Sequence, residues 1–252
     1  MADALLATEG LVKRFGGLVA TDNLSLDVRP GEIHALIGPN GAGKTTVVAQ
    51  LSGLLAPTSG RILFEGRDIT RLPMPSRSLL GIARSFQITS VLKDFTTLDN
   101  VALAVQAHQG HSFRFWQPAR RDASLRDPSR KVLNDLGLGE RADVMTSALS
   151  HGEQRQLEIA MALAGEPRVL LLDEPMAGMG PEESARMVEF LKNLKGSRGM
   201  LLVEHDMDAV FALADRITVL VYGRAIATGT PAEIRSNAEV RDAYLGADNM
   251  VA

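Results

Sequence analysis

Four short apolar runs alternate along the chain with longer stretches whose apolar residues recur every three or four positions. The runs are rich in leucine and β-branched residues and lie at 33–37, 169–172, 200–203 and 217–221. Their length and composition predict buried strands. Helical spacing is clearest at 45–54, which Gly53 closes, and in the segment that begins at Pro181 with two glutamates in its first turn. Strands and helices that alternate in this way predict a parallel sheet covered by helices.

Residues from about 90 to 165 follow a different pattern. Helical spacing recurs at 99–108 and 128–138, and no segment there has the pattern of a strand. A locally basic stretch at 111–131 contains Trp116 and is predicted to be an irregular surface insertion. We therefore predict one α/β domain. Its core is formed by residues 1–89 and 166–252 and is interrupted by a helical subdomain at about 90–165.

Composition and charge exclude several classes of protein but do not identify a function. The chain has 252 residues, enough for one large domain, and 27 basic against 30 acidic residues give a net charge of −3. Nothing in this balance indicates nucleic acid as a partner. The absence of cysteine excludes disulfides and cysteine-based sites. No apolar run approaches the ~18 residues of a membrane span, and residues 1–15 lack the apolar segment of a secretory signal. We expect a cytosolic protein, or one held at a membrane only by a partner.

The first chemical signal follows the strand predicted at 33–37. The segment reads Gly38, Pro39, Asn40, Gly41, Ala42, Gly43, Lys44 and Thr45, which matches the pattern G-x-x-x-x-G-K-[ST] between a strand and a helix. Glycines let successive backbone N–H groups point at phosphate oxygens, and the helix N-terminus adds partial positive charge. Lys44 then reaches the β- and γ-phosphates, and the Thr45 hydroxyl is a ligand for Mg²⁺. These features predict a loop that binds nucleotide phosphates.

The second signal is a pair of carboxylates after the strand predicted at 169–172. Asp173 supplies the hard oxygen that Mg²⁺ prefers, and Glu174 is placed to polarise an attacking water as a general base. An apolar run that ends in an acidic residue is, on its own, an ordinary strand terminus. Together with the phosphate loop, the pair predicts a P-loop nucleotide hydrolase.

Three further segments have both a functional and an ordinary interpretation. Ser150 and Gly152 lie at a predicted helix start, where a hydroxyl, backbone N–H groups and the helix dipole suit an anion, although a serine there is also a common N-cap. Gln87 ends a strand-like run, and a single glutamine is normally a surface residue. His205 follows the strand predicted at 200–203 and either faces a γ-phosphate or has a structural role.

The order of these five segments resembles the ATP-binding subunit of ABC transporters over essentially the whole chain. The resemblance implies a P-loop NTPase core of the RecA type with a mainly parallel sheet, an N-terminal antiparallel β subdomain and an inserted α-helical subdomain. It also implies ATP and Mg²⁺ as cofactors. Residues 149–154 are similar to the family signature, usually Leu-Ser-Gly-Gly-Gln, with His151 and Glu153 in place of a glycine and the glutamine.

The resemblance also implies a role for each matching residue. Gln87 is similar to the glutamine that senses the γ-phosphate and Mg²⁺, His205 to the switch histidine, and Phe15 to the aromatic residue that stacks on adenine. The implied catalytic residues are Glu174, His205, Gln87 and Lys44, and the implied Mg²⁺ ligands are Thr45, Gln87 and Asp173. The implied nucleotide contacts are Phe15, the nine residues from Gly38 to Thr46, and Ser150, Gly152 and Glu153 of a second subunit.

Several details are similar to the subfamily that imports branched-chain amino acids. They lie at 13–18, 204–207, 229–231 and 243–246. The resemblance implies membrane-spanning permease subunits, a second ATPase subunit (a copy or a paralogue) and, indirectly, a periplasmic binding protein as partners. It places the chain at the cytoplasmic face of the inner membrane, held there by the permease. The alternatives are a urea-type importer, the ATPase of lipopolysaccharide export, and a soluble ABC ATPase that is not coupled to transport.

Overall fold

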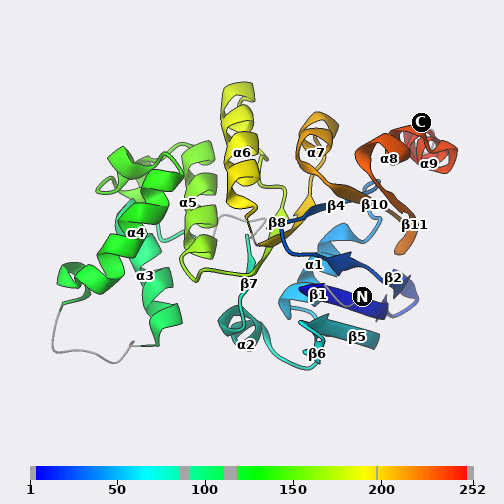
Figure 1. Cartoon of the computed structure of the whole chain (residues 1–252), viewed down its shortest axis with the longest axis horizontal. Helices are drawn as coiled ribbons and strands as arrows, with labels where there is room; N and C mark the ends of the chain where they lie inside the picture. Colours follow the sequence, from blue (N-terminus) through cyan, green and yellow to red (C-terminus); the bar gives the residue numbers. More distant parts are fainter. Residues whose placement is uncertain (1–3, 86–90, 111–117, 197, 249–252) are drawn as a thin grey trace.

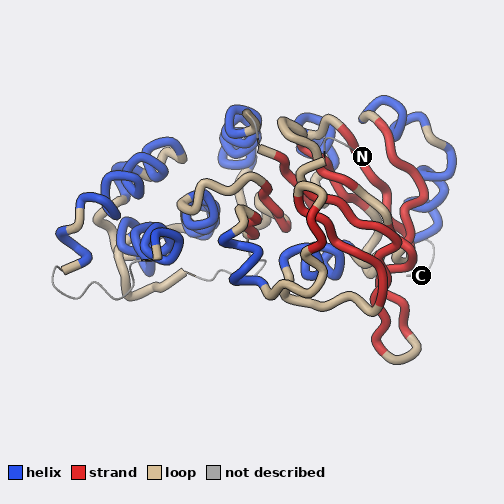
Figure 2. Tube along the Cα trace, turned by 60° about the horizontal axis from the view of Figure 1, so that its bottom comes forward, coloured by secondary structure: helices blue, strands red, loops and turns tan. Residues whose placement is uncertain are grey.

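The computed structural model describes residues 4–85, 91–110, 118–196 and 198–248, with side chains described up to residue 243. The molecule is elongated (Figure 1). A group of helices that includes α3, α4 and α5 forms one end, and the strands gather at the other, as Figure 2 also shows. Within the described ranges, no helix is long and apolar enough to cross a membrane.

The larger sheet has six strands and is mainly parallel, as predicted. Its strands, in spatial order, are β11 (Arg224–Gly229), β10 (Arg216–Val221), β4 (Ile33–Ile37), β9 (Gly199–Val203), β8 (Val169–Asp173) and β7 (Ile82–Arg84). Only β11 runs antiparallel to its neighbour. Every residue of β4, β8 and β9 is buried, which is why these strands are mainly apolar in the sequence and do not alternate with polar residues. The carboxyl ends of the parallel strands therefore all lie at the same edge of the larger sheet.

The smaller sheet is antiparallel and is built from the N-terminal part of the chain, as the resemblance implied. It contains β1 (Leu6–Phe15), β2 (Leu18–Leu24), β3 (Asp27–Val28), β5 (Ser59–Phe64) and β6 (Arg67–Asp68). Apolar side chains of β1 pack in one buried cluster with side chains of the larger sheet and of α1 (Lys44–Ser52). Leu6, Leu36 and Val47 are members of this cluster, each fully buried. The two sheets therefore share a core with the helix that follows the phosphate loop.

Helix α1 ends at Gly53, close to the predicted end, and its last carbonyls are satisfied by a buried arginine. Gly53 adopts the left-handed conformation that closes many helices. Arg77 of α2 (Met74–Leu79) is only 1% exposed and donates hydrogen bonds to four carbonyl oxygens. These belong to Gln50 and Leu51 at 2.8 Å, and to Thr70 and Leu72 at 2.9 Å. Arg77 thus ties the end of α1 to the segment that precedes α2.

The helical end of the molecule contains α3 (Thr97–Gln109), α4 (Ala123–Asp135) and α5 (His151–Leu163). The prediction that 111–131 is irregular is wrong for its second half, because α4 begins at residue 123 and not at 128. Asp122 caps the helix by accepting a hydrogen bond from the Ser124 N–H at 2.9 Å. Pro128 lies inside α4, and the Ser124 carbonyl that it deprives of a helical partner accepts from Gln109 at 3.2 Å instead. Trp116 lies outside the described residues.

Three further helices each follow a strand of the larger sheet. They are α6 (Pro181–Leu194), α7 (Met207–Leu213) and α8 (Pro231–Ser236), and α9 (Ala238–Asp248) follows α8. Helix α6 begins at Pro181 and has Glu182 and Glu183 in its first turn, as predicted. Its buried residues Met187 and Leu191 face the same core cluster as α5. The N-terminus of α6 consequently lies beside the N-terminal half of α5, which places two helix starts in one region (Figure 1).

Candidate functional site

The phosphate loop follows β4 and turns directly into α1, as predicted. Gly41 and Gly43 have φ angles of 78° and 106°, which favour glycine. A Cβ atom at Gly43 would collide with the carbonyl oxygen of Ala20 in β2, and one at Gly38 would collide with that of Leu220 in β10. Gly38 and Gly43 therefore allow β10 and β2 to pack closely against the loop. This packing role is separate from any contact of the loop with phosphate.

A cavity of about 400 Å³ lies over this loop and collects most of the residues proposed to contact nucleotide. Its walls include Phe15, the seven residues from Asn40 to Thr46, Glu174 and His205, together with Leu18, Val19, Ala20 and Tyr222. Gly38 and Pro39 are not among the lining residues. Tyr222 was missed by the sequence analysis: it lies in the turn between β10 and β11, is 75% exposed, and no pattern around it marks a binding residue.

Lys44 is buried beneath the cavity and is already held by the loop. Its Nζ donates hydrogen bonds to the carbonyl oxygens of Gly38 at 2.6 Å and Pro39 at 3.0 Å. Burial lowers the pKa of Lys44, while the negative charges of Glu174 and Asp173 raise it. Gly38 and Pro39 thus contribute to the site by holding the lysine rather than by lining the cavity.

Glu174 and His205 meet at the mouth of the cavity although 31 positions separate them. Each follows one of two adjacent parallel strands, β8 and β9, and His205 Nε2 lies 2.6 Å from Glu174 Oε1. Glu174 has a φ angle of 52°, an uncommon conformation for a residue with a side chain. Its N–H bonds to the Val203 carbonyl at 2.8 Å, and its carbonyl accepts from Arg155 at 2.8 Å. The backbone on both sides of Glu174 is therefore fixed.

Asp173 ends β8 as a fully buried carboxylate. Its Oδ2 forms an ion pair with Arg84 of β7 at 3.2 Å. Its Oδ1 is buried and has no hydrogen-bond partner among the described residues, an arrangement that fits a cation ligand. Burial raises the pKa of Asp173, and the charge of Arg84 opposes that shift. Gln87, the other expected Mg²⁺ ligand besides Thr45, lies outside the described residues.

Two buried charged residues that support the site were missed by the sequence analysis. Arg155 of α5 donates to the carbonyl oxygens of both Asp173 and Glu174 and pairs with Glu158 at 2.6 Å. Glu204 accepts hydrogen bonds from the N–H groups of Met176 at 2.8 Å and of His205 at 3.0 Å. Burial raises the pKa of Glu204. Both hold backbone segments, and the local sequence around Arg155 and Glu204 does not show which segments these are.

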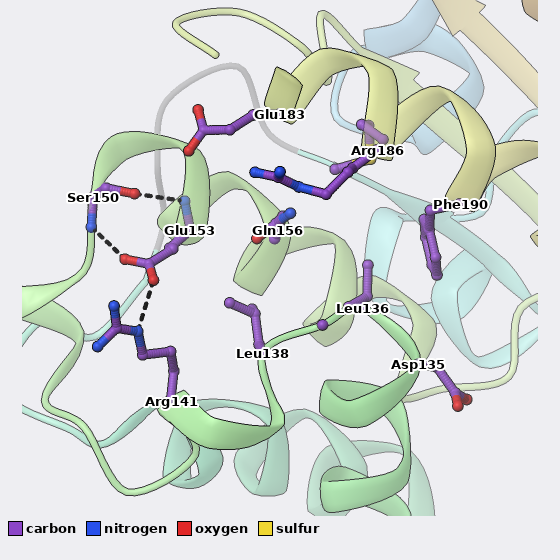
Figure 3. Close-up of a pocket in the computed structure, with 12 residues that line it drawn as sticks. Asp135, Leu136, Leu138, Arg141, Ser150, Glu153, Gln156, Glu183, Arg186 and Phe190 are labelled. Carbon is purple, nitrogen blue, oxygen red and sulfur yellow. Dashed lines mark hydrogen bonds and ion pairs between the residues drawn. The ribbon is translucent and has the colours of Figure 1, made fainter. Parts of the chain in front are cut away.

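The signature residues lie in a second cavity and not over the phosphate loop. Ser150 and Glu153 line a space of about 590 Å³ between the end of α4, the start of α5 and α6 (Figure 3). Gly152 faces α6 so closely that a Cβ atom there would lie 2.7 Å from a carboxylate oxygen of Glu183. None of the three signature residues Ser150, Gly152 and Glu153 lines the phosphate-loop cavity. One chain therefore does not bring the two predicted halves of the nucleotide site together.

A phosphate loop between a buried strand and a helix, with acidic residues at the end of a nearby parallel strand, defines a P-loop nucleotide hydrolase. The comparisons with known proteins specify which kind. The family model described as ABC transporter matches residues 21–177, and one described as branched-chain amino acid ATP-binding cassette transporter matches residues 226–249. The chain belongs to the ABC transporter family and is an ATP hydrolase of that family.

Relatives in the same family cover nearly the whole chain. The high-affinity branched-chain amino acid transport ATP-binding protein LivG of Salmonella typhimurium is 41% identical over 98% of this chain and 99% of its own length. The protein BraF of Pseudomonas aeruginosa, with the same description, is 37% identical over 98% and 99%. The lipopolysaccharide export system ATP-binding protein LptB of Escherichia coli is more distant, at 32% over 97% and 98%.

The fold also matches solved structures of this family. The ADP conformation of MJ1267, an ATP-binding cassette of an ABC transporter, superposes with a TM-score of 0.85 at 30% identity. The match covers 96% of this chain and 99% of that one. The ABC ATPase fold implied by the sequence is confirmed.

Proposed function

We propose that this chain is the ATP-hydrolysing subunit that drives an importer of branched-chain amino acids. The observation that supports hydrolysis is the Glu174–His205 pair at the mouth of the phosphate-loop cavity. The transported substrate class is supported by the relatives named above and by the match of residues 226–249.

The residues of the site divide the work of binding ATP. Phe15 is half exposed at the cavity edge, with the Lys13 ammonium 5.2 Å from its ring centre, and stacks on the adenine. Lys44 transfers its hydrogen bonds from the Gly38 and Pro39 carbonyls to the β- and γ-phosphates. Mg²⁺ would be held by Thr45, Asp173 Oδ1 and Gln87, and it supplies charge neutralisation of the phosphates.

Glu174 is the general base in this proposal. A ring N–H of His205 donates to Oε1, so the carboxylate is oriented and its other oxygen is available to a water molecule in the cavity. Glu174 takes a proton from that water as the water oxygen attacks the γ-phosphorus, the bond between the γ-phosphorus and the bridging oxygen breaks, and ADP leaves with that oxygen. His205 fixes the direction of the carboxylate, while Arg155 fixes the backbone that carries it.

A second ATPase subunit completes each site. Ser150, Gly152 and Glu153 lie at the N-terminus of α5, where the hydroxyl and the helix dipole suit a phosphate. Because none of them lines the chain's own phosphate-loop cavity, we infer that Ser150 and Gly152 contact the ATP held by a partner, with Glu153 beside them, so that two subunits enclose two nucleotides. No nucleic acid takes part.

An apolar groove offers a place for the permease. It has a volume of about 330 Å³, lies between α2, α3 and α5, and includes Met74, Ile82, Ala107 and Met161 in its lining. Arg84 lines the same groove and pairs with Asp173. A permease segment in this groove would hold the chain at the cytoplasmic face of the inner membrane. It would contact Arg84, which in turn contacts Asp173, the expected metal ligand. A periplasmic binding protein would supply the amino acid from the other side.

Glu174→Gln tests the hydrolytic part of the proposal. The amide keeps the shape and the acceptor for His205 but cannot take a proton, so turnover falls roughly 10²–10⁴-fold while ATP still binds. With ATP, size-exclusion chromatography with light scattering then detects a dimer, and adding Ser150→Arg restores the monomer. Parental turnover in Glu174→Gln would remove the general base from the mechanism, and a dimer that tolerates Ser150→Arg would remove the shared site.

Reconstitution tests the transport part. The chain is copurified with its membrane-spanning subunits, placed in proteoliposomes and supplied with the cognate binding protein. We expect ATP hydrolysis and uptake to rise with leucine, isoleucine or valine and not with urea. Stimulation by urea alone, copurification with a lipopolysaccharide exporter, or failure to associate with any membrane subunit would each contradict this assignment.

A further inference from the structure

The N-terminus of α5 is held by three hydrogen bonds, two of which end on the Glu153 carboxylate (Figure 3). Glu153 Oε2 accepts the Ser150 N–H at 2.8 Å, and the Ser150 hydroxyl oxygen accepts the Glu153 N–H at 3.2 Å, which together form a capping box. Arg141, at the end of the short helix η2 (Gly139–Arg141), donates through Nε to Glu153 Oε1 at 2.8 Å. Both oxygens of the Glu153 carboxylate are therefore occupied.

This arrangement determines what the Ser150 hydroxyl can still do. Its oxygen already accepts one hydrogen bond from within the helix, which restricts the rotation of the side chain. Its proton also lies within hydrogen-bonding reach of the Glu153 carboxylate, so that carboxylate and an acceptor outside the chain compete for it. A phosphate oxygen at the helix start would be such an acceptor.

The negative charge of the Glu153 carboxylate would also repel a phosphate at the start of α5. Although partial burial raises the pKa of Glu153, the hydrogen bond from the Ser150 backbone and the charge of Arg141 lower it further, so the group is ionised at neutral pH. An uncompensated carboxylate three residues from Ser150 would repel an incoming γ-phosphate. Arg141 places a positive charge against it from a neighbouring element, and the Glu153 side chain is 22% exposed in this pair.

We propose that Arg141 is a positioning residue for the Ser150 hydroxyl of the shared ATP site, acting by holding and neutralising the Glu153 carboxylate. This inference rests on the proposed function, because Ser150 matters only if it meets the nucleotide of a second subunit. The positive charge of Arg141 in this ion pair offsets the repulsion between the Glu153 carboxylate and the phosphate. Arg141 itself touches neither Ser150 nor the nucleotide in this scheme.

The test is a double-mutant cycle of Arg141→Gln and Glu153→Gln in the Glu174→Gln background. The readout is the dissociation constant of the ATP-dependent dimer, measured by analytical ultracentrifugation. An exposed ion pair is worth roughly threefold in binding, and each dimer contains two, so Arg141→Gln weakens the dimer about tenfold. In the Glu153→Gln background the same change has less than about a twofold effect, because no carboxylate is left to neutralise.

Arg61→Gln is the matched control. Arg61 also forms an exposed ion pair, with Glu9, and it lines neither the Ser150 cavity nor the phosphate-loop cavity. It leaves the dimer constant within about twofold. Binding of a fluorescent ATP analogue to the monomer is measured for every variant and does not change, because the phosphate loop lies in the other cavity.

The possible failures are distinguishable. If Glu174→Gln does not dimerise with ATP, the shared site of the proposed function is wrong. If it dimerises and Ser150→Arg abolishes the dimer, but Arg141→Gln behaves like Arg61→Gln, only the positioning role is overturned. An equal loss from Arg141→Gln with and without Glu153 would also overturn it, because a structural role of Arg141 does not depend on that carboxylate.

Discussion

Replacing Arg77 by methionine is expected to destabilise the protein more than removing a complete surface ion pair. Arg77 donates to four backbone carbonyl oxygens, two of them in the last turn of α1. Methionine fills a similar volume without donors, so the buried Leu51 carbonyl and the partly buried Thr70 and Leu72 carbonyls lose their partner. The Gln50 carbonyl loses one of two partners, because it also accepts from the Gly53 N–H at 3.2 Å. Four hydrogen bonds at about 1 kcal/mol each total about 4 kcal/mol, and relief of the buried guanidinium returns part of this. We expect a loss of about 3 kcal/mol in the free energy of unfolding.

Urea unfolding followed by circular dichroism measures this loss, and Arg61→Met is the control. Arg61 pairs with Glu9 on the surface and is 63% exposed, so its replacement costs at most about 1 kcal/mol. In thermal unfolding the loss at Arg77 corresponds to roughly 6–12 °C for a chain of this size. If Arg77→Met lost less than about 1 kcal/mol, or no more than Arg61→Met, the argument from unpaired carbonyls would be refuted.

Two further predictions concern the phosphate loop and a buried histidine. Lys44→Ala is expected to weaken ATP binding at least about 100-fold, because it removes the cation from the phosphates; near-parental affinity in titration calorimetry would contradict this. His34 is buried, and burial lowers its pKa below 6.5. As the pH falls, His34 is therefore protonated in the unfolded chain before it is protonated in the folded protein. The contribution of His34 to the free energy of unfolding is fully present above pH 6.5 and decreases as the pH falls below 6.5. Urea unfolding at pH 7.5 and 5.5 measures this, and His34→Gln is expected to remove that part of the dependence.

The sequence predicted those parts of the structure that depend on local pattern. β4, the phosphate loop and α1 form a contiguous strand, turn and helix, so one segment contains all the information needed. β8 and β9 were recognisable because every residue in them is buried. The start of α4 was missed because Pro128 normally marks a boundary, whereas here Asp122 caps the helix six residues before that proline.

Supporting contacts between distant segments could not be predicted in the same way. Arg155 reaches the carbonyls of Asp173 and Glu174, and Arg77 reaches those at the end of α1, through a fold that no local pattern specifies. The position of Ser150 away from the phosphate loop follows from the packing of α5 beside α6. The assignment of its partner subunit depends on this separation, which the sequence alone does not contain.

The hydrogen bonds of Lys44 also bear on how nucleotide binding is driven. A free lysine side chain loses roughly 1.5–2 kcal/mol of rotamer entropy when it is fixed. Here the Gly38 and Pro39 carbonyls already fix it, so that loss accompanies folding and not ligand association. If ATP binds as proposed, phosphate oxygens replace these two neutral acceptors by charged ones at nearly constant side-chain entropy. In that proposal the loop is a preorganised receptor, and its gain on binding is expected to be mainly enthalpic.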